Sequence, residues 1–410
     1  MTITGAPGFQ GALNIPPSLL VNGVDMPVTS IGQDAFQLHG SITAVTIANT
    51  VSNIGDYAFQ GCSLTSVTIP DSISNIGLDT FGKCYNLTNI TIPKSVTNIS
   101  GYAFEYNHFV NVTIPGSVLG IGLGAFYSSS SLSTVTINDG TTIIGNMAFQ
   151  RCNNLRTVAI PDSVTSIGDS AFAGCNFVNI SLPSNLTNLG YSALGSCTNL
   201  TSISLPDNVP TIGMYTFYKC YNLTNLTLGR NVTSLGDLAL GYCRKLTQII
   251  LPEALTNIGK QAISYCYSLT NIIIPRNVSI VGDLAFESCT NLTGIYFEGN
   301  SPAVGATPFL MDSNVTVYYL PGTSGWGPTF GGVPTAVWRP RLGPSGVQAS
   351  QFGFNIAWAS NMTVVVEAST DLANPLWSPV ETNTLTSKTL FFSDPNPTNY
   401  SQRFYRARWQ

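Results

Sequence analysis

Apolar residues recur with a fixed spacing along most of the chain. The pattern Ile-Gly-x-x-Ala-Phe, or a close variant of it, first occurs at residues 31–36 and then returns every 22 or 23 residues. Its first apolar position is filled in thirteen successive units by Ile31, Ile54, Ile76, Ile99, Ile121, Ile144, Ile167, Leu189, Ile212, Leu235, Ile258, Val281 and Val304. A period of this length predicts a protein built from stacked repeats.

A second pattern, Leu-x-x-Val-x-Ile-Pro, precedes the first in most units, as at residues 64–70. Val67 and Ile69 are two residues apart and face one side of an extended chain, whereas Thr68 faces the other side. Pro70 has no N–H to donate to a neighbouring strand, so it ends the extended segment. Each unit is therefore expected to contain one half-buried strand that is followed by a corner.

A second short extended run, residues 73–76, carries the chain along the opposite side of the unit. Gly77 permits a bend there, and Phe81 supplies a large side chain to the interior. One such unit cannot enclose its apolar side chains alone, but thirteen stacked units form a continuous core. The predicted fold is a mainly β repeat solenoid, shaped as a horseshoe or as a gently curved column.

These two patterns resemble the BspA-type leucine-rich repeat family of bacterial surface proteins, and the resemblance extends over residues 31–321. The resemblance implies secretion or surface display and binding to proteins or to matrix, and it transfers no catalytic residue. The chain departs from the family pattern at Ser100, which replaces glycine, and at Leu194, Leu240 and Ile263, which replace phenylalanine. These departures affect local packing but not the expected fold.

Residues 1–30 are interpreted as an N-terminal cap that covers the first layer of the core. The spacing from Ile15 to Ile31 exceeds the usual spacing, which places a nine-residue insertion at about residues 19–27. Met1 lies directly before the strand-like residues 2–4. We therefore expect that an upstream secretion signal has been removed or is missing from this sequence.

The C-terminal part of the chain departs from the repeat. The thirteenth unit is degenerate, and we expect Leu320 in the place that Phe297 occupies one unit earlier. Residues 322–340 are rich in Gly, Pro, Thr and Ser and are interpreted as a cap and linker. Residues 341–410 alternate apolar and polar positions, with turn residues at 394–399, and predict a small all-β domain. That segment resembles the β-sandwich modules that close many secreted bacterial proteins.

Composition excludes several classes of protein. Charged residues make up only 9% of the chain, and hydrophobic residues make up 44%, which argues against disorder. Sixteen Lys and Arg against twenty Asp and Glu leave a net charge of −4, too little positive charge for nucleic acid binding. No apolar run is long enough for a spanning helix, so we expect no membrane insertion.

The cysteines all occupy one repeat position, three residues after the core phenylalanine or its substitute. They are Cys62, Cys84, Cys152, Cys175, Cys197, Cys220, Cys243, Cys266 and Cys289. In other units this position holds His39, Asn107, Ser129 and Asp312. The odd count and the even spacing match neither a disulfide framework nor a metal site, so we expect buried free thiols.

The chain offers little for catalysis. Its two histidines, His39 and His108, lie three units apart and at different positions of the repeat, so they do not converge on one site. We therefore expect no enzyme activity, no cofactor and no metal. Arg403, Arg406 and Arg408 near the C-terminus are either a seat for an anionic surface or solvated strand residues.

The outward positions of the concave strands give the most informative signal. They hold Thr, Ser or Ala in the early units and become apolar at the C-terminal end, where Ile250, Ile273, Tyr296 and Tyr319 follow one another. Val317 adds an apolar residue to the adjacent row. Apolar side chains grouped on a polar surface indicate a contact site for a ligand. The alternative is that the C-terminal region covers these side chains.

Together these features predict a non-catalytic extracellular or cell-surface scaffold for protein-protein interaction or adhesion. Its partner would be a protein or matrix ligand, or else a glycan. Rows of Thr and Asn and exposed tyrosines would also suit a carbohydrate-binding protein, and a purely structural surface protein is the other alternative. The sequence leaves the oligomeric state open.

Overall fold

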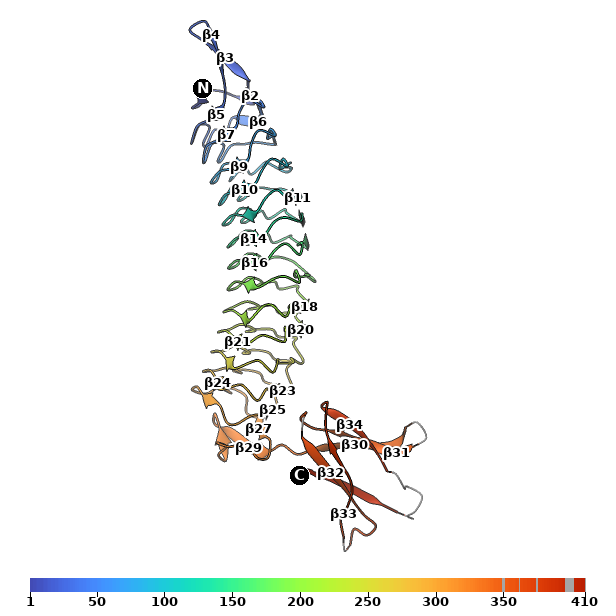
Figure 1. The fold of residues 1–410 in the computed structure, drawn as a ribbon. Coiled ribbons are helices and arrows are strands. Elements are labelled where there is room, and N and C mark those ends of the chain that lie inside the picture. The colour runs from blue at the N-terminus through green and yellow to red at the C-terminus, as the bar shows by residue number, and fades with distance from the viewer. Residues whose placement is uncertain (349–350, 361, 374, 395–401, 410) are drawn as a thin grey trace.

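The computed structural model describes residues 1–348, 351–360, 362–373, 375–394 and 402–409. Within these residues the chain consists of strands, turns and irregular segments, without a helix. Figure 1 shows an elongated, gently curved column of stacked turns with a small domain beside its C-terminal end. The predicted repeat solenoid is therefore confirmed. The turn predicted at residues 394–399 lies, beyond Asp394, outside the described residues.

Two-residue strands stack in parallel along one side of the column (Figure 1). They are β1 (Thr2–Ile3), β5 (Ser30–Ile31), β7 (Asn53–Ile54), β9 (Asn75–Ile76), β10 (Asn98–Ile99), β12 (Gly120–Ile121), β14 (Ile143–Ile144), β16 (Ser166–Ile167), β17 (Asn188–Leu189), β19 (Thr211–Ile212), β21 (Ser234–Leu235), β22 (Asn257–Ile258), β24 (Ile280–Val281) and β26 (Ala303–Val304). From β5 onward, the second residue of each strand is a predicted repeat anchor. The repeat period therefore sets one strand per turn on this side.

Longer strands run along the opposite side, here called the long-strand face. They are β2 (Gly11–Ile15), β6 (Ile42–Ile47), β8 (Ser66–Thr68), β11 (Asn111–Ile114), β13 (Thr134–Ile137), β15 (Thr157–Ala159), β18 (Ser202–Ser204), β20 (Asn225–Thr227), β23 (Asn271–Ile274), β25 (Gly294–Phe297) and β27 (Thr316–Tyr319). Neighbouring strands are parallel, and their side chains alternate between the core and the surface, as in β11. This face therefore presents one outward row of side chains in each unit.

The turn after each short strand contains two residues in the left-handed backbone region, four positions apart. In the first unit these are Asp34 and Leu38, with φ angles of 56° and 59°. Only three of these positions in the thirteen units are glycine: Gly61, Gly124 and Gly174. The amide nitrogens of Asp34 and Leu38 donate to carbonyl oxygens of the next unit at 3.0 and 2.7 Å. Stacking therefore holds a backbone conformation that side chains ordinarily disfavour.

Aromatic rings form the centre of the column. From Phe36 to Phe172 the core phenylalanines of successive units stack nearly parallel, with ring centroids 5.2 to 5.9 Å apart. Leu194, Leu240 and Ile263 fill the same place in later units and are fully buried. These substitutions interrupt the ring stack but leave the core continuous, because large apolar side chains still fill the space.

Uncharged polar side chains cover the strands. Thr65 and Thr97 each donate a hydroxyl hydrogen bond to a carbonyl oxygen of the preceding unit, at 3.0 and 3.1 Å. Asn98 donates to the side-chain oxygen of Asn75 at 2.5 Å. Neighbouring strands lie about 4.8 Å apart, so a row of like charges would repel along the column. This geometry accounts for the low proportion of charged residues.

In eleven of the thirteen units the cysteine position holds a small side chain that donates a hydrogen bond. All nine cysteines are buried free thiols, as predicted, and each sulfur donates to a backbone carbonyl oxygen of the preceding unit at 2.9 to 3.4 Å. Asn107 and Ser129 fill this position with the same bond, at 2.9 and 3.2 Å. Burial raises the pKa of Cys62 to about 11 and that of Cys152 to about 12. The thiols therefore stay protonated and donate.

The bond that this position makes can be tested at Cys175, whose sulfur donates to the carbonyl of Phe149 at 3.3 Å. Cys175→Ala should lower the free energy of unfolding by about 1–2 kcal/mol, because it removes one of the two hydrogen bonds to that carbonyl, which also accepts from the amide of Cys152 at 3.2 Å, and leaves a small cavity. Cys175→Ser keeps a donor and should lower it by less than Cys175→Ala does. Urea denaturation measures both values. An equal loss for the two variants would show that cavity volume, and not the hydrogen bond, determines the effect.

The N-terminal segment extends the repeat and adds a hairpin. β1 pairs with β5 and β2 pairs with β6, both in parallel register. Between these two turns, β3 (Ser18–Val21) and β4 (Val24–Pro27) form an antiparallel hairpin where the insertion is predicted, at the N-terminal tip of the column (Figure 1). Leu20 and Val24 in this hairpin are exposed.

The thirteenth unit differs from its predicted register by one residue. Tyr318 pairs with Tyr296, and Tyr319 pairs with Phe297. The predicted places of Tyr319 and Leu320 are therefore wrong. The physical reason is a shorter turn. Gly294 comes five positions after Cys289, whereas Thr316, the partner of Gly294, comes only four positions after Asp312. A shift of one residue in a strand moves each side chain to the opposite face.

Two segments follow the solenoid. β29 (Val333–Val337) pairs in parallel with β27 and in antiparallel with β28 (Thr329–Phe330), which closes the column. The remaining strands are β30 (Arg341–Gln348), β31 (Gln351–Ala357), β32 (Thr363–Ser369), β33 (Ser378–Thr384), β34 (Thr389–Ser393) and β35 (Phe404–Trp409). They form two three-stranded antiparallel sheets, β30-β31-β34 and β33-β32-β35. Phe354, Trp358 and Val364 are buried in this C-terminal domain.

Candidate functional site

Three of the five predicted contact residues lie in one outward row at the C-terminal end of the long-strand face. Ile250 bridges to Thr227, and Ile273 pairs with Tyr296. The row continues to Tyr318, which the sequence analysis missed because it assumed an unbroken 23-residue spacing. Ile250 is 77% exposed. An apolar strip therefore follows the threonine-rich part of the face.

The other two predicted contact residues lie elsewhere. Val317 points into the core and is fully buried, and Tyr319 stacks on Trp326 with ring centroids 5.2 Å apart. Both positions result from the shorter turn before β27, which reverses the faces expected for these side chains. Neither side chain contributes to the outward row.

The ring of Tyr296 lies along its own strand above Gly294. A Cβ atom at Gly294 would lie only 2.7 Å from this ring, so a residue with a side chain would displace the tyrosine. The ring also stacks on Tyr318 with centroids 4.8 Å apart. Gly294 and Tyr318 therefore fix Tyr296 flat against the strands.

The C-terminal domain is seated on this fixed tyrosine. Trp338 packs against the ring of Tyr296 with centroids 5.0 Å apart, and Arg341 donates to the Tyr296 hydroxyl at 2.9 Å. Trp358 donates its indole hydrogen to the carbonyl oxygen of Trp338 at 3.1 Å. These aromatic side chains form one buried cluster across the junction. The domain thus covers Tyr296 but leaves Ile250 uncovered, so both alternatives from the sequence apply, each to part of the row.

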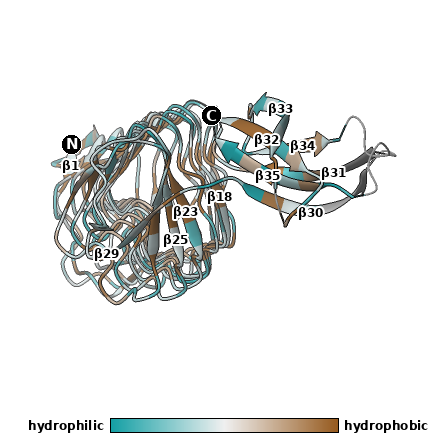
Figure 2. Cartoon of the chain, turned by 90° about the horizontal axis from the view of Figure 1, so that it is seen from below, coloured by the Kyte–Doolittle hydropathy of each residue, from teal (hydrophilic) through white to brown (hydrophobic). Residues whose placement is uncertain are grey.

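A cleft of about 920 Å³ lies between the uncovered part of the row and the C-terminal domain. Ile250, Ile273 and Asn271 line it from the solenoid. Arg341, Trp358 and Lys388 line it from the other side. Figure 2 shows the domain standing beside the long-strand face near β18 and β23. The domain residues carry no repeat or motif signal, so sequence reasoning could not connect them with the row.

The described lining of the cleft is positively charged. Arg341 and Lys388 line it, and no aspartate or glutamate does so among the described residues. Lys388 lies 3.7 Å from the buried carboxylate of Glu298. Burial raises the pKa of Glu298, although the Lys388 cation opposes this shift. Within the part of the chain that the structure describes, no carboxylate forms an ion pair with Arg341.

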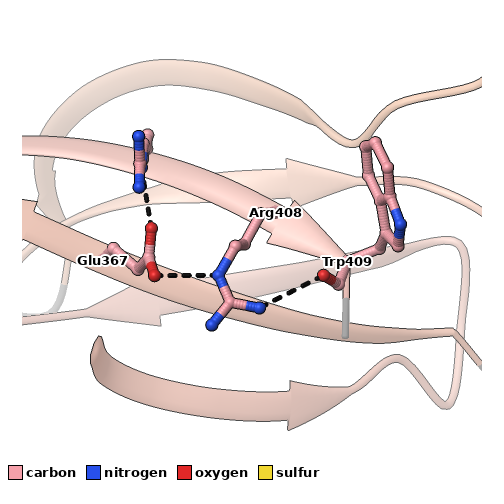
Figure 3. A network of polar contacts seen from close by, with 4 residues as sticks. Glu367, Arg408 and Trp409 are labelled. Atoms are coloured by element: carbon pink, nitrogen blue, oxygen red, sulfur yellow. Dashed lines mark hydrogen bonds and ion pairs between the residues drawn. The ribbon is translucent and has the colours of Figure 1, made fainter. Parts of the chain in front are cut away.

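The arginines near the C-terminus pair with buried carboxylates, and Arg406 and Arg408 are at the same time exposed to solvent on strand β35, which agrees with the expectation of solvated strand residues. Arg406 and Arg408 on β35 donate to the two oxygens of Glu367 on β32 at 2.7 and 2.8 Å (Figure 3). The bond from Arg408, together with that from Arg406, holds the pKa of Glu367 below its ordinary value. Arg403 lies 2.9 Å from the carboxylate of Asp394. These contacts bind the strands of the C-terminal domain together.

Other kinds of site receive no support from the geometry. In the described residues, no three His, Cys, Asp or Glu side chains are grouped so that they could hold a metal ion. The same part of the chain contains no helix of the length and apolarity that would cross a membrane.

Comparison with known proteins agrees with the repeat architecture. The family described as "BspA type Leucine rich repeat region" matches residues 23–132, 120–243 and 210–323, in six copies. A leucine-rich repeat protein from Bacteroides ovatus has a similar structure, with 30% identity, a TM-score of 0.63, and coverage of 78% of this chain and 90% of that chain. A leucine rich cell surface protein from Faecalibacterium prausnitzii has 27% identity and a TM-score of 0.51, with coverage of 79% and 90%. No curated protein matches the chain significantly.

Proposed function

Because the chain belongs to the BspA-type leucine-rich repeat family, we propose that it is a non-catalytic scaffold, secreted or displayed at the cell surface, that binds a protein ligand in its cleft. The similar protein from Faecalibacterium prausnitzii is described as a cell surface protein, which supports this location. The observation that carries the proposal is the position of Ile250. It is an exposed aliphatic side chain that begins the apolar end of a row whose earlier units are mostly threonine and serine, and it lies at the floor of a cleft.

The cleft suits a protein better than a sugar. Sugar rings commonly bind on the exposed face of an aromatic side chain, whereas Tyr296, Trp338 and Trp358 are each less than 10% exposed. The accessible apolar surface comes from the branched side chains of Ile250 and Ile273 instead. A purely structural role does not explain an uncovered Ile250, because the early units carry threonine in this row without loss of the fold.

The experiment replaces Ile250 and Ile273 by threonine, the residue that most earlier units carry in the same row. The full-length chain is screened by biolayer interferometry against a panel of extracellular matrix and surface proteins. For any ligand found, the double variant should bind at least about tenfold more weakly, because it loses the apolar floor of the cleft. Thermal denaturation should show an unchanged fold.

The matched control is Val178→Thr, which removes an exposed valine from the long-strand side of an earlier unit. This variant should bind like the unmodified chain. A glycan array provides the contrary outcome: binding to glycans without binding to any protein on the panel would contradict the proposal. If the double variant binds the protein ligand as tightly as the unmodified chain does, the binding site lies outside the cleft.

A further inference from the structure

The guanidinium of Arg341 lines the cleft and forms no ion pair with a described carboxylate. An arginine carries five N–H donors in a planar fork that matches a carboxylate. Arg341 donates to the hydroxyl of Tyr296, a neutral partner, and no described carboxylate lies within ion-pair distance of it. The residue is exposed. Its remaining donors can therefore receive an anionic group that enters the cleft.

Lys388 adds less positive charge to the cleft than Arg341 does, because it is paired with Glu298. Its ammonium group lies 3.7 Å from Glu298, whose carboxylate is buried behind the lining. This ion pair offsets most of the lysine charge at short range, whereas Arg341 has no such compensation among the described residues. An incoming anion is therefore expected at Arg341 and not at Lys388.

The apolar floor lies in the same cleft as this cation. Ile250 and Ile273 occupy successive units of the outward row, and Tyr296, whose hydroxyl accepts from Arg341, is the next residue along it. Neighbouring residues of the row lie about 4.8 Å apart. The floor and the guanidinium are thus about one or two units apart along the row, a separation that suits side chains two residues apart on one extended peptide, since these face the same side.

We propose that the cleft recognises an extended peptide segment of a partner protein in which an apolar side chain lies two residues from a carboxylate. The apolar side chain packs on Ile250 and Ile273, and the carboxylate pairs with Arg341. This inference rests on the proposed function and specifies the chemistry of the partner. Charge complementarity supports it, since the lining holds two cations and no described acid.

The test uses a displayed library of random peptides, selected on the immobilised full-length chain. The selected peptides should be enriched in Asp or Glu two residues from Leu, Ile, Val or Phe. The dissociation constant of one such peptide should rise at least about tenfold with Arg341→Gln. Arg341→Lys keeps the charge but loses the fork of donors and should give an intermediate value. Added salt should weaken binding to the unmodified chain more than binding to Arg341→Gln.

The matched control is Arg156→Gln, which removes an exposed arginine from the long-strand side of an earlier unit and should leave peptide binding unchanged. Thermal denaturation of Arg341→Gln checks that loss of the bond to Tyr296 has not released the C-terminal domain. Rescue by Arg341→Lys provides a second check, because a released domain would not recover affinity through a lysine.

Each outcome has a distinct meaning. If peptide binding depends on Ile250 and Ile273 but not on Arg341, this inference is overturned and the proposed function remains intact. Failure to select any peptide, or selection of peptides that neither change affects, would overturn both. Polygalacturonate serves as an anionic glycan probe: binding that requires Arg341, without peptide binding, would replace the peptide by an acidic sugar.

Discussion

A chain that ends at Pro340 should self-associate at concentrations where the full-length chain does not. The C-terminal domain covers the aromatic cluster at Tyr296 and Trp338, each less than 10% exposed. Removing residues 341–410 exposes these rings and Leu320 as one apolar patch. Burying a single aromatic side chain yields about 2–3 kcal/mol, so two exposed rings favour contact between copies.

Sedimentation velocity of the two chains at equal concentrations measures this effect. A shortened chain that also carries Tyr296→Thr and Trp338→Ser should sediment as one copy, because these changes remove most of the exposed apolar area. Self-association of the shortened chain in spite of both substitutions would indicate a different contact surface. A shortened chain that remains monomeric would show that the patch is covered without the domain.

Replacing Asp312 by asparagine should stabilise the chain at pH 8 by about 1–3 kcal/mol and have a smaller effect at pH 5. Asp312 fills the position at which cysteine, asparagine or serine donates a hydrogen bond in other units, yet an ionised carboxylate cannot donate. Both of its oxygens are buried without a partner. Asparagine fills this position at Asn107, where it donates to a carbonyl oxygen at 2.9 Å. The substitution therefore supplies the missing donor.

The pH dependence follows from the raised pKa of Asp312. Burial raises this pKa from 3.8 to about 7, and the charge of Glu287 adds to the shift. At a pH between these two pKa values, Asp312 is protonated in the folded chain and ionised in the unfolded chain. The free energy of unfolding therefore falls as the pH rises from about 4 to about 7. Well above pH 7 the full loss of stability from the ionised Asp312 is present, and below pH 4 there is no such loss.

Urea denaturation at pH 5 and pH 8 measures the free energy of unfolding of both chains. The matched control is Asp71→Asn, an exposed aspartate at a repeat corner, which should change stability by less than about 0.5 kcal/mol at either pH. An Asp312→Asn chain that gains the same stability at both pH values would show that the ionisation of Asp312 is not the cause.

The repeat pattern predicted the solenoid because each unit repeats the same physical requirements. Ile31 and its equivalents lie on successive short strands as expected, since an apolar residue at a fixed spacing can only be buried if the turns stack in register. The free thiols were predictable for the same reason. The sequence did not reveal why Asn107 and Ser129 replace cysteine, because the shared hydrogen bond becomes visible only when the units are stacked.

The candidate site was predictable only in part. Ile250, Ile273 and Tyr296 follow from the 23-residue spacing, whereas Tyr318 and Tyr319 exchange places because one turn is a residue shorter. Counting residues cannot detect where in a degenerate unit a deletion falls. Arg341, Trp358 and Lys388 reach the cleft through packing of the C-terminal domain on Tyr296, a long-range contact that no local pattern encodes.

The left-handed turns have a consequence for how the chain folds. At the turn positions, 23 residues other than glycine hold a positive φ angle. Each one is disfavoured in isolation by about 1–2 kcal/mol, and in the first twelve units an amide hydrogen bond to the next unit offsets part of this cost. A single unit is therefore a poor folding nucleus. A unit that adds to an existing stack finds hydrogen-bond partners already in place on its folded neighbour. Folding should be cooperative over several neighbouring units, and loss of structure should begin at the two ends, where a turn has a neighbour on one side only.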